Sequence, residues 1–444
     1  MQKRIYLESL GCAKNQVDSE ILLSYAIDRG YEVVSDPGKA SLIVVNSCGF
    51  IEDAKKESIE TVLSFRKLYP HAYIVLAGCL SERYMDQMDF EEVDAMFGNR
   101  NLSEFPKVLE ASERRDKYFL HPDYPEGMYD ERCDRKILLS LPKSAYLKIS
   151  EGCNHRCAYC AIPIIRGSLR SRPKESLVKE AEELLKSGVY EINIVAQDLA
   201  AYGTDWDGKS HFVDLMDALS SLDGDFVLRM LYIHPDFFPF ELLELMKERR
   251  KILPYFDIPI QHVDEKVLRP MGRVGDEDTY LDLIGRIRHE LPDAVIRSTL
   301  TLGFPGEDDE SFALLEDFVR KADLDWLGTF LYSREEGTAA WKMRNKKEHD
   351  KAHKKARSYQ VELEKIQGEV SRKRASMFVG KRFRALVEEK IEGGDALSFG
   401  RIYSQAPEVD GVTVIVGGDL KPGDVVDVEI TKSMDFDLEG KVIG

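Results

Sequence analysis

Residues 151–160 read Glu151-Gly152-Cys153-Asn154-His155-Arg156-Cys157-Ala158-Tyr159-Cys160 and place three thiols in one short loop directly after a predicted strand. Cysteine thiolates are the usual ligands of 4Fe-4S clusters, and three thiolates leave one iron open to bind a small molecule. A zinc knuckle and buried structural thiols are the alternatives, but structural zinc usually takes four ligands, often from C-x2-C pairs. The spacing therefore predicts a cluster held by Cys153, Cys157 and Cys160.

The loop opens a longer series of alternating strand and helix patterns. The candidate strands are at 145–150, 191–196, 226–233, 256–260, 294–302 and 326–332. Repeated strand and helix units favour a parallel sheet with right-handed connections. We therefore predict a partial barrel of six βα units over residues 145–340, with the cysteine loop after its first strand.

A second set of three cysteines lies in the amino-terminal region, for which alternating strand and helix patterns predict a parallel α/β domain over 1–101. Its β-rich runs are at 4–7, 42–46 and 73–77. Cys12, Cys48 and Cys79 each follow one of these runs and each adjoin a glycine. Carboxyl ends of parallel strands meet at one edge of a sheet, so these thiols can converge there. Metal ligation and a purely structural role are equally compatible with this spacing.

The rest of the chain divides by composition. Residues 102–144 combine several prolines with many charges and poor apolar periodicity, which indicates a connector. Residues 341–376 are highly charged and contain a single glycine and no proline, which predicts one linking helix. From 377 to 444, β-branched residues alternate with glycine-rich turns, and this pattern predicts a small all-β barrel. The expected fold class is therefore α/β, with an amino-terminal parallel α/β domain, a central partial (βα)6 barrel and a carboxy-terminal β-barrel.

Composition limits the classes of function. At 444 residues the chain exceeds what one hydrophobic core usually fills. We find no apolar run near the roughly 20 residues that span a bilayer, and no secretory signal. The net charge of −17 disfavours nucleic acid and suits a basic protein partner. Seven cysteines, an odd number, fit metal ligation in a reducing compartment. We therefore expect a cytoplasmic protein without membrane contact, in which Cys133, outside both sets, carries no chemistry.

The cysteine loop resembles the signature of the radical S-adenosylmethionine superfamily, C-x3-C-x2-C with an aromatic residue before the last cysteine, a position that Tyr159 occupies. The resemblance implies that the open iron chelates S-adenosylmethionine and that the cluster cleaves it to a 5′-deoxyadenosyl radical. It also implies that Tyr159 packs against the adenine. Gln197 and Asp198, after the second barrel strand, are candidates to hold the rest of the cofactor, and a turn that caps the following helix is the alternative.

The order of the predicted domains is similar to that of the methylthiotransferase family over nearly the whole chain. This resemblance implies that Cys12, Cys48 and Cys79 hold a second 4Fe-4S cluster, which presents the sulfur to be transferred. It also implies two molecules of S-adenosylmethionine per turnover, one for the methyl group and one for the radical. An electron donor such as a flavodoxin is the expected redox partner.

Local features separate the branches of that family. Gly11-Cys12-Ala13-Lys14-Asn15, followed by Val17-Asp18-Ser19-Glu20, looks like the branch that modifies an aspartate of small-subunit ribosomal protein twelve (uS12). The branch that modifies transfer RNA typically has Gln-Met after the cysteine. The run Arg166-Gly167-Ser168-Leu169-Arg170-Ser171-Arg172 also looks like the ribosomal branch, and it fits an acidic substrate loop or a solvated surface equally well.

The last domain resembles a TRAM domain, an RNA-binding module in the transfer RNA enzymes. Residues 377–444 hold eight Lys and Arg against thirteen Asp and Glu, a balance of −5, which disfavours phosphate binding. The leading prediction is therefore methylthiolation of the uS12 aspartate at its β-carbon, with weak nucleic acid binding at most. A transfer RNA adenosine methylthiotransferase is the alternative, and a non-enzymatic iron or redox sensor is a more distant rival. We assign no catalytic residue beyond the six cysteine ligands.

Overall fold

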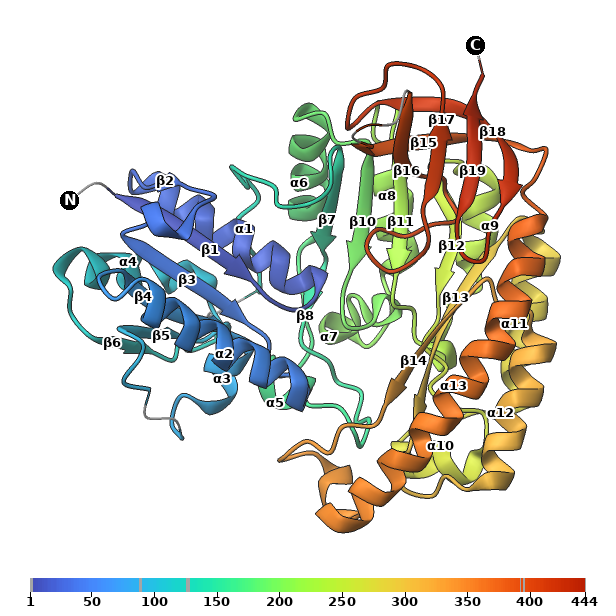
Figure 1. The fold of residues 1–444 in the computed structure, drawn as a ribbon, viewed down its shortest axis with the longest axis horizontal. Helices are drawn as coiled ribbons and strands as arrows, with labels where there is room; N and C mark the ends of the chain where they lie inside the picture. Colours follow the sequence, from blue (N-terminus) through green and yellow to red (C-terminus); the bar gives the residue numbers. More distant parts are fainter. Residues whose placement is uncertain (1–2, 88–89, 125–127, 392, 394–395, 444) are drawn as a thin grey trace.

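The computed structural model describes residues 3–87, 90–124, 128–391, 393 and 396–443. The predicted outer limits Met1 and Gly444 lie outside these residues, as do residues 125–127 of the predicted connector. Two parallel sheets lie side by side, and a closed β-barrel packs against the second sheet (Figure 1). The described residues contain no helix that is long and apolar enough to cross a membrane.

The first sheet has six parallel strands in the order β2-β1-β3-β4-β5-β6. The strands are β1 Arg4–Ser9, β2 Glu32–Val33, β3 Leu42–Ser47, β4 Tyr73–Gly78, β5 Ala95–Phe97 and β6 Tyr118–Leu120. The helices are α1 Ala13–Asp28, α2 Glu52–Leu68, α3 Cys79–Tyr84 and α4 Phe105–Arg114. Both central strands are buried along their whole length, which explains their unbroken apolar sequence. Val44 and Val75 face α1 and α4, whereas Val45 and Leu76 face α2.

The predicted runs at 4–7, 42–46 and 73–77 are therefore strands, each extended by one or two residues. The short strands β2, β5 and β6 were not predicted, because two or three residues are too few to show the alternation of apolar and polar side chains that marks a strand. Residues 102–144, expected as a connector, contain α4 and β6, and β6 pairs with β5 as the last strand of the first sheet. The sheet thus continues beyond residue 101, the predicted end of the first domain.

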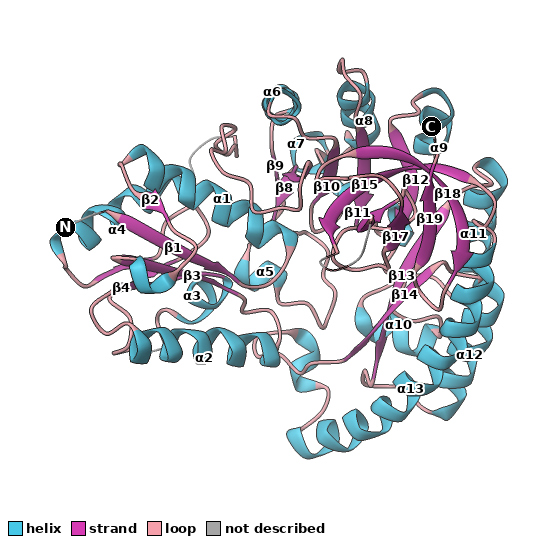
Figure 2. Ribbon diagram, turned by 45° about the horizontal axis from the view of Figure 1, so that its top comes forward, coloured by secondary structure: helices cyan, strands magenta, loops and turns pink. Residues whose placement is uncertain are grey.

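The second sheet has six parallel strands in the sequential order β14-β13-β12-β11-β10-β7. Its strands are β7 Ser144–Lys148, β10 Glu191–Val195, β11 Val227–Leu231, β12 Ile252–Asp257, β13 Val295–Leu302 and β14 Trp326–Leu331. The helices are α5 Ile162–Ile165, α6 Lys174–Lys186, α7 Thr204–Asp207, α8 Phe212–Ser220, α9 Glu241–Glu248, α10 Glu265–Met271, α11 Glu277–Glu290 and α12 Asp309–Ala322. Helices on the outer face and strands in chain order give the predicted partial (βα)6 barrel (Figure 2).

Five of the six predicted barrel strands match within a few residues, but the fourth does not. It was predicted at 256–260 and runs over Ile252–Asp257. Pro254 lies inside this strand, and proline normally argues against a central strand because it lacks the N–H of the ladder. The pairing of β11 with β12 is irregular at this point, which accommodates the proline.

Two short strands and one long helix complete the central part of the chain. β8 Ser150–Glu151 and β9 Arg170–Ser171 form a small antiparallel pair beside the cysteine loop. The long helix α13 Lys346–Ser376 packs along β14 and α12, where the rings of Phe312 and Tyr359 stack at 3.8 Å. The linking helix predicted over 341–376 therefore begins at Lys346, where Asn345 caps it.

The closed barrel has the strand order β15-β16-β17-β19-β18. Its strands are β15 Arg382–Lys390, β16 Leu397–Arg401, β17 Thr413–Val416, β18 Val425–Ser433 and β19 Leu438–Val442. It contacts the second sheet where the strands begin. Arg401 pairs with Glu191, the first residue of β10, and Trp326, the first residue of β14, donates to the Ser404 carbonyl. The opposite, carboxyl edge of the second sheet is therefore left for the cysteine loop.

Candidate functional site

The first set of cysteines lies in an irregular loop after β7 and β8. The Ala158 N–H donates to the Met271 carbonyl, and the Ala158 carbonyl accepts from the Ala340 N–H, each at 2.8 Å. Gly152, before the loop, has φ of 75°, and a Cβ there would lie 2.1 Å from the Ser168 carbonyl oxygen. Only glycine fits such an approach. The barrel backbone thus anchors Cys153, Cys157 and Cys160 within one loop.

The second set comes from three separate connections at the edge of the first sheet. Cys12 precedes α1, Cys48 follows β3, and Cys79 is the first residue of α3. The strands β1, β3 and β4 are neighbours in the sheet, so their carboxyl ends lie together. A Cβ added to Gly11 would lie 3.4 Å from Sγ of Cys48, which shows how close the Cys12 and Cys48 segments are. All six cysteines of the two sets are free.

The two sets approach each other where the first sheet meets the barrel. Cys79 is buried against Ala161 and Ile165, and Ala161 directly follows Cys160 in the chain. The short helices α3 and α5 are accordingly in contact. Sequence reasoning predicted each set separately, and the structure brings Cys79 against the short helix that follows Cys160.

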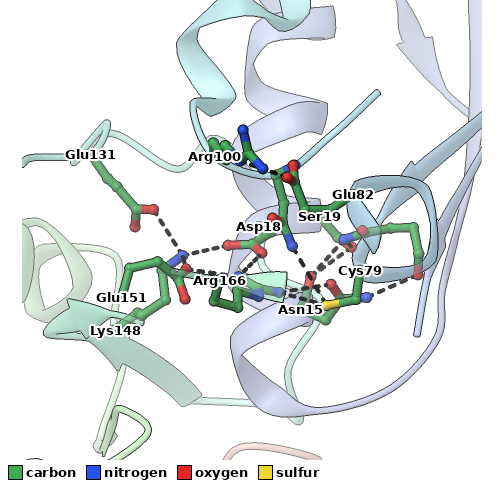
Figure 3. Close-up of polar contacts among 12 residues, drawn as sticks. Asn15, Asp18, Ser19, Cys79, Glu82, Arg100, Glu131, Lys148, Glu151 and Arg166 are labelled. Carbon is green, nitrogen blue, oxygen red and sulfur yellow. Dashed lines mark hydrogen bonds and ion pairs between the residues drawn. The ribbon is translucent and has the colours of Figure 1, made fainter. Parts of the chain in front are cut away.

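Arg166 connects the sets through buried polar contacts (Figure 3). Its Nη1 donates to Asp18 and Glu151, both at 2.7 Å. Its Nη2 donates to Oδ1 of Asn15 at 3.2 Å and to Sγ of Cys79 at 3.3 Å. Although burial would raise it, the charge of Arg166 keeps the pKa of Glu151 well below its usual range. One guanidinium therefore touches a cysteine of the second set and a carboxylate beside the first.

A cluster of three carboxylates lies behind Arg166 but needs no metal. Asp18, Glu131 and Glu151 each offer an oxygen within a few ångströms of the others. The Lys148 ammonium lies among them, at 2.8 Å from Glu131 and 2.9 Å from Glu151, with a further contact to Asp18. Its side chain is fully buried. This ion-pair network therefore supplies its own cation.

Burial around three of the cysteines disfavours a thiolate unless a positive charge accompanies it. Burial raises the pKa of Cys79 to about 12 and the pKa of Cys160 to about 12. Burial likewise raises the pKa of Cys153 to about 11. A thiolate held in such a place needs positive charge, which bound iron supplies. The all-sulfur donor sets, with Arg166 beside one and Arg273 near the other, fit iron–sulfur clusters better than a hard cation.

Tyr159 lies against the barrel, directly before Cys160. Its hydroxyl accepts a hydrogen bond from Nη2 of Arg273 at 3.1 Å, and its ring packs edge-on against Phe304 at 6.3 Å. Arg273 is buried and was not predicted from the sequence. A contact of the Tyr159 ring with adenine stays a prediction.

Gln197 and Asp198 follow β10 and lie close to the cysteine loop. Nε2 of Gln197 donates to Oε1 of Glu151 at 3.0 Å. Asp198 accepts from the backbone N–H groups of Ala200 and His234, both at 3.0 Å, and its other oxygen lies 2.7 Å from Nε2 of His155. The capping alternative is thus confirmed for Asp198, and a cofactor contact by either residue stays a prediction.

The basic run over 166–172 is neither solvated nor open to a substrate at its two ends. Arg166 is buried as described, and Arg172 is buried and pairs with Glu180 at 2.7 Å. Both interpretations of this run were therefore wrong for these two arginines, because buried carboxylates of the chain itself pair with them. Cys133 is partly buried beside Arg172, with its Sγ 3.2 Å from the Ser176 hydroxyl.

Comparison with known proteins covers all three parts of the chain. Residues 4–98 match uncharacterized protein family UPF0004, residues 147–319 match the radical SAM superfamily, and residues 379–443 match a TRAM domain. Radical S-adenosylmethionine enzymes use a 4Fe-4S cluster and S-adenosylmethionine, as the cysteine loop predicted. Among solved structures, the radical S-adenosylmethionine methyltransferase TsrM from Kitasatospora setae has a TM-score of 0.54 at 15% identity, and the alignment covers 74% of this chain and 75% of that one. That likeness concerns the fold alone.

Curated relatives match over the full length. A protein from Treponema denticola is 39% identical, over 98% of this chain and 99% of its own. Proteins from Acetivibrio thermocellus and Thermotoga maritima are each 40% identical, over 99% or more of both chains. All three carry the name ribosomal protein uS12 methylthiotransferase RimO. This chain, with its two adjacent cysteine sets, therefore belongs to the RimO family of radical S-adenosylmethionine methylthiotransferases.

Proposed function

We propose that this protein transfers a methylthio group to the β-carbon of an aspartate in ribosomal protein uS12. The observation that carries the proposal is the contact of Cys79, in the second set, with Ala161 and Ile165, which follow Cys160 of the first set. The names of the full-length relatives support the same reaction and the same protein substrate. We further propose one 4Fe-4S cluster at Cys153, Cys157 and Cys160 and a second at Cys12, Cys48 and Cys79.

When bound, the first cluster supplies the electron that cleaves S-adenosylmethionine, and the second supplies an open iron for the sulfur to be transferred. Arg166 donates to Sγ of Cys79 and so stabilises negative charge on that ligand. Tyr159, whose hydroxyl accepts a hydrogen bond from Arg273, is the candidate to pack against the adenine. Gln197 and Asp198 line the same edge of the barrel and are the candidates for the remaining cofactor contacts.

The proposal includes partners that the reaction requires. Two molecules of S-adenosylmethionine are used in each turnover, and an electron donor such as a flavodoxin reduces the first cluster. The substrate is a basic ribosomal protein, free or within the ribosome, which suits a chain of net charge −17. We also propose a cytoplasmic location, because ribosomal proteins are made and assembled in the cytoplasm.

Transfer RNA adenosine is the other substrate known for this architecture, and it is not favoured. The full-length relatives are named for the ribosomal protein. The TRAM domain here has the acidic balance of −5 over residues 377–444, which opposes the binding of a phosphate backbone.

The direct test is anaerobic reconstitution with iron and sulfide, followed by reaction with S-adenosylmethionine, dithionite and a peptide that carries the uS12 aspartate loop. Mass spectrometry then follows both the peptide and nucleosides from added transfer RNA. A methylthio mass gain on the peptide is the expected result. A gain on adenosine would replace the proposed substrate, and the absence of 5′-deoxyadenosine would contradict the radical mechanism.

A further inference from the structure

Lys14 is a buried cation that reaches from the second cysteine set to the carboxyl edge of the barrel. It lies two residues after Cys12 in α1 and is 8% exposed. Its Nζ donates to the carbonyl of Ala196, after β10, at 3.3 Å. The same atom lies 4.6 Å from the ring centre of Tyr232, after β11. Barrel enzymes place their chemistry at this edge, so Lys14 points into the reacting region.

Lys14 differs from most buried cations of the described chain because it has no carboxylate partner there. The buried cations with ion pairs are Lys148, Arg166, Arg172, Arg229 and Arg401. Arg273 also lacks a carboxylate among the described residues, but it donates to Tyr159 and Pro259 and lies beside the three-cysteine loop. Lys14 is thus the unpaired cation next to Cys12.

The acidic side chains around Lys14 are already engaged. Asp257 lies close enough for the charge of Lys14 to act on it, but it pairs with Arg297 at 3.1 Å. Asp198, two residues after Ala196, contacts His155 and two backbone N–H groups. A buried ammonium ordinarily requires a counter-charge, and its three N–H groups exceed the one carbonyl bond it makes. The charge of Lys14 also acts on the Cys12 thiol and lowers its pKa. No carboxylate of the described residues pairs with the ammonium, so its remaining N–H groups can bind an anionic oxygen from outside the chain.

We propose that Lys14 binds the side-chain carboxylate of the substrate aspartate and thereby selects aspartate over asparagine. The inference rests on the proposed function, in which the reacting atom is the β-carbon of that aspartate. This carbon is bonded directly to the carboxylate carbon, so an ion pair to Lys14 fixes the reacting C–H group one bond away. The carboxylate supplies a counter-charge to the ammonium, whereas an asparagine amide oxygen accepts a hydrogen bond from it without neutralising its charge.

The test measures binding rather than turnover alone. Reconstituted full-length protein is titrated anaerobically into two fluorescent peptides, one with the uS12 aspartate and one with asparagine in its place. The wild type is expected to prefer the aspartate peptide by about 10- to 100-fold, the scale of a hydrogen bond to a charged group. Lys14→Met is expected to bind both peptides equally, and Lys14→Arg to recover part of the preference. Lys179→Met, at an exposed position of α6, is the matched control and keeps the full preference.

Each outcome bears on a different part of the inference. Equal binding of both peptides by Lys14→Met, with normal iron content, supports the role. Preserved discrimination in that variant overturns it while leaving the proposed substrate intact. Loss of iron from Lys14→Met also overturns it, because the lysine would then serve the cluster. A wild type that binds neither peptide removes the proposed substrate and the inference with it. Lys14→Gln, which keeps an N–H donor for Ala196, replaces Lys14→Met if that variant folds poorly.

Discussion

The two cysteine sets differ in how the chain assembles them. Cys153, Cys157 and Cys160 lie in one loop whose backbone is bonded to the barrel on both sides. Cys12, Cys48 and Cys79 come from three connections, and their alignment depends on the register of three neighbouring strands. The first set therefore needs one well-anchored loop, whereas the second needs a folded sheet docked on the barrel.

The sets also differ in their polar support. Backbone N–H groups and Arg273 surround the loop, whereas Cys79 accepts from Arg166, which belongs to the barrel. The second site therefore depends on the contact between the sheets. Arg166 is one of the residues that link the two, together with Lys148 and Lys14. Variants at the loop should therefore affect only the first set, whereas variants at the contact between the sheets should affect the second set and the stability of the protein together.

The largest effect is expected at the loop. Cys157→Ala removes one of the three proposed ligands of the first cluster. It should lower 5′-deoxyadenosine formation by more than about 1,000-fold, which is the effect of removing an essential member of a catalytic group. Chromatography of the reaction mixture measures it. Cys133→Ala is the control and should form 5′-deoxyadenosine as the wild type does. Substantial cleavage by Cys157→Ala would show that the loop holds no such cluster.

Removing a cysteine of the second set should separate cleavage of S-adenosylmethionine from transfer of the methylthio group. Cys79→Ala is expected to lose methylthio transfer to the peptide while 5′-deoxyadenosine formation falls far less, because the change removes a ligand of the proposed sulfur-bearing cluster alone. Parallel mass spectrometry of the peptide and the nucleoside gives both rates. Equal losses of 5′-deoxyadenosine and of the methylthiolated peptide would contradict separate roles for the two cysteine sets.

Arg166→Met tests the link between the sets. It leaves Asp18 and Glu151 buried without this partner, and removal of one member of a buried ion pair costs about 3–5 kcal/mol in the free energy of unfolding. Chemical denaturation of the metal-free protein measures the change. Arg269→Ala, which breaks the exposed pair with Glu265, should change stability by less than about 1 kcal/mol. Similar losses in the free energy of unfolding for the two variants would show that the buried ion pairs of Arg166 do not stabilise the fold.

The smallest expected effect is a pH dependence. Arg166 and Lys148 outweigh burial and hold the pKa of Glu151 below its ordinary value of 4.5. The stability that this carboxylate contributes is therefore complete above pH 4.5 and is lost as the pH falls towards the folded-state pKa. Glu151→Gln should be about 2 kcal/mol less stable at pH 7, and the difference should shrink below pH 4.5. A constant difference between pH 3 and pH 7 would exclude this origin.

Sequence reasoning succeeded where the signal was local or periodic. The loop at 153–160 and the strand ends before Cys12, Cys48 and Cys79 could be read directly, because spacing and apolar runs determine them. It failed at β12, where Pro254 concealed a strand, and at β5 and β6, which are too short to show a period.

The support of the site could not be read from the sequence. Lys148 and Asp18 are 130 residues apart, and Arg166 and Asp18 are 148 apart, so no spacing rule connects them. The basic run over 166–172 signalled charge but not its buried partners. In the sequence, Lys14 served only as part of a motif that separates two branches of the methylthiotransferase family. Its position at the edge of the barrel is visible only in the folded structure.

We expect the two cysteine sets to hold two separate clusters. Iron and sulfide analysis with Mössbauer spectroscopy, applied to the reconstituted wild type and to a variant with Cys12, Cys48 and Cys79 all changed to Ala, tests it most directly. The account predicts about eight irons per chain in the wild type and about four in the variant, both as 4Fe-4S clusters. About four irons in both proteins would contradict it.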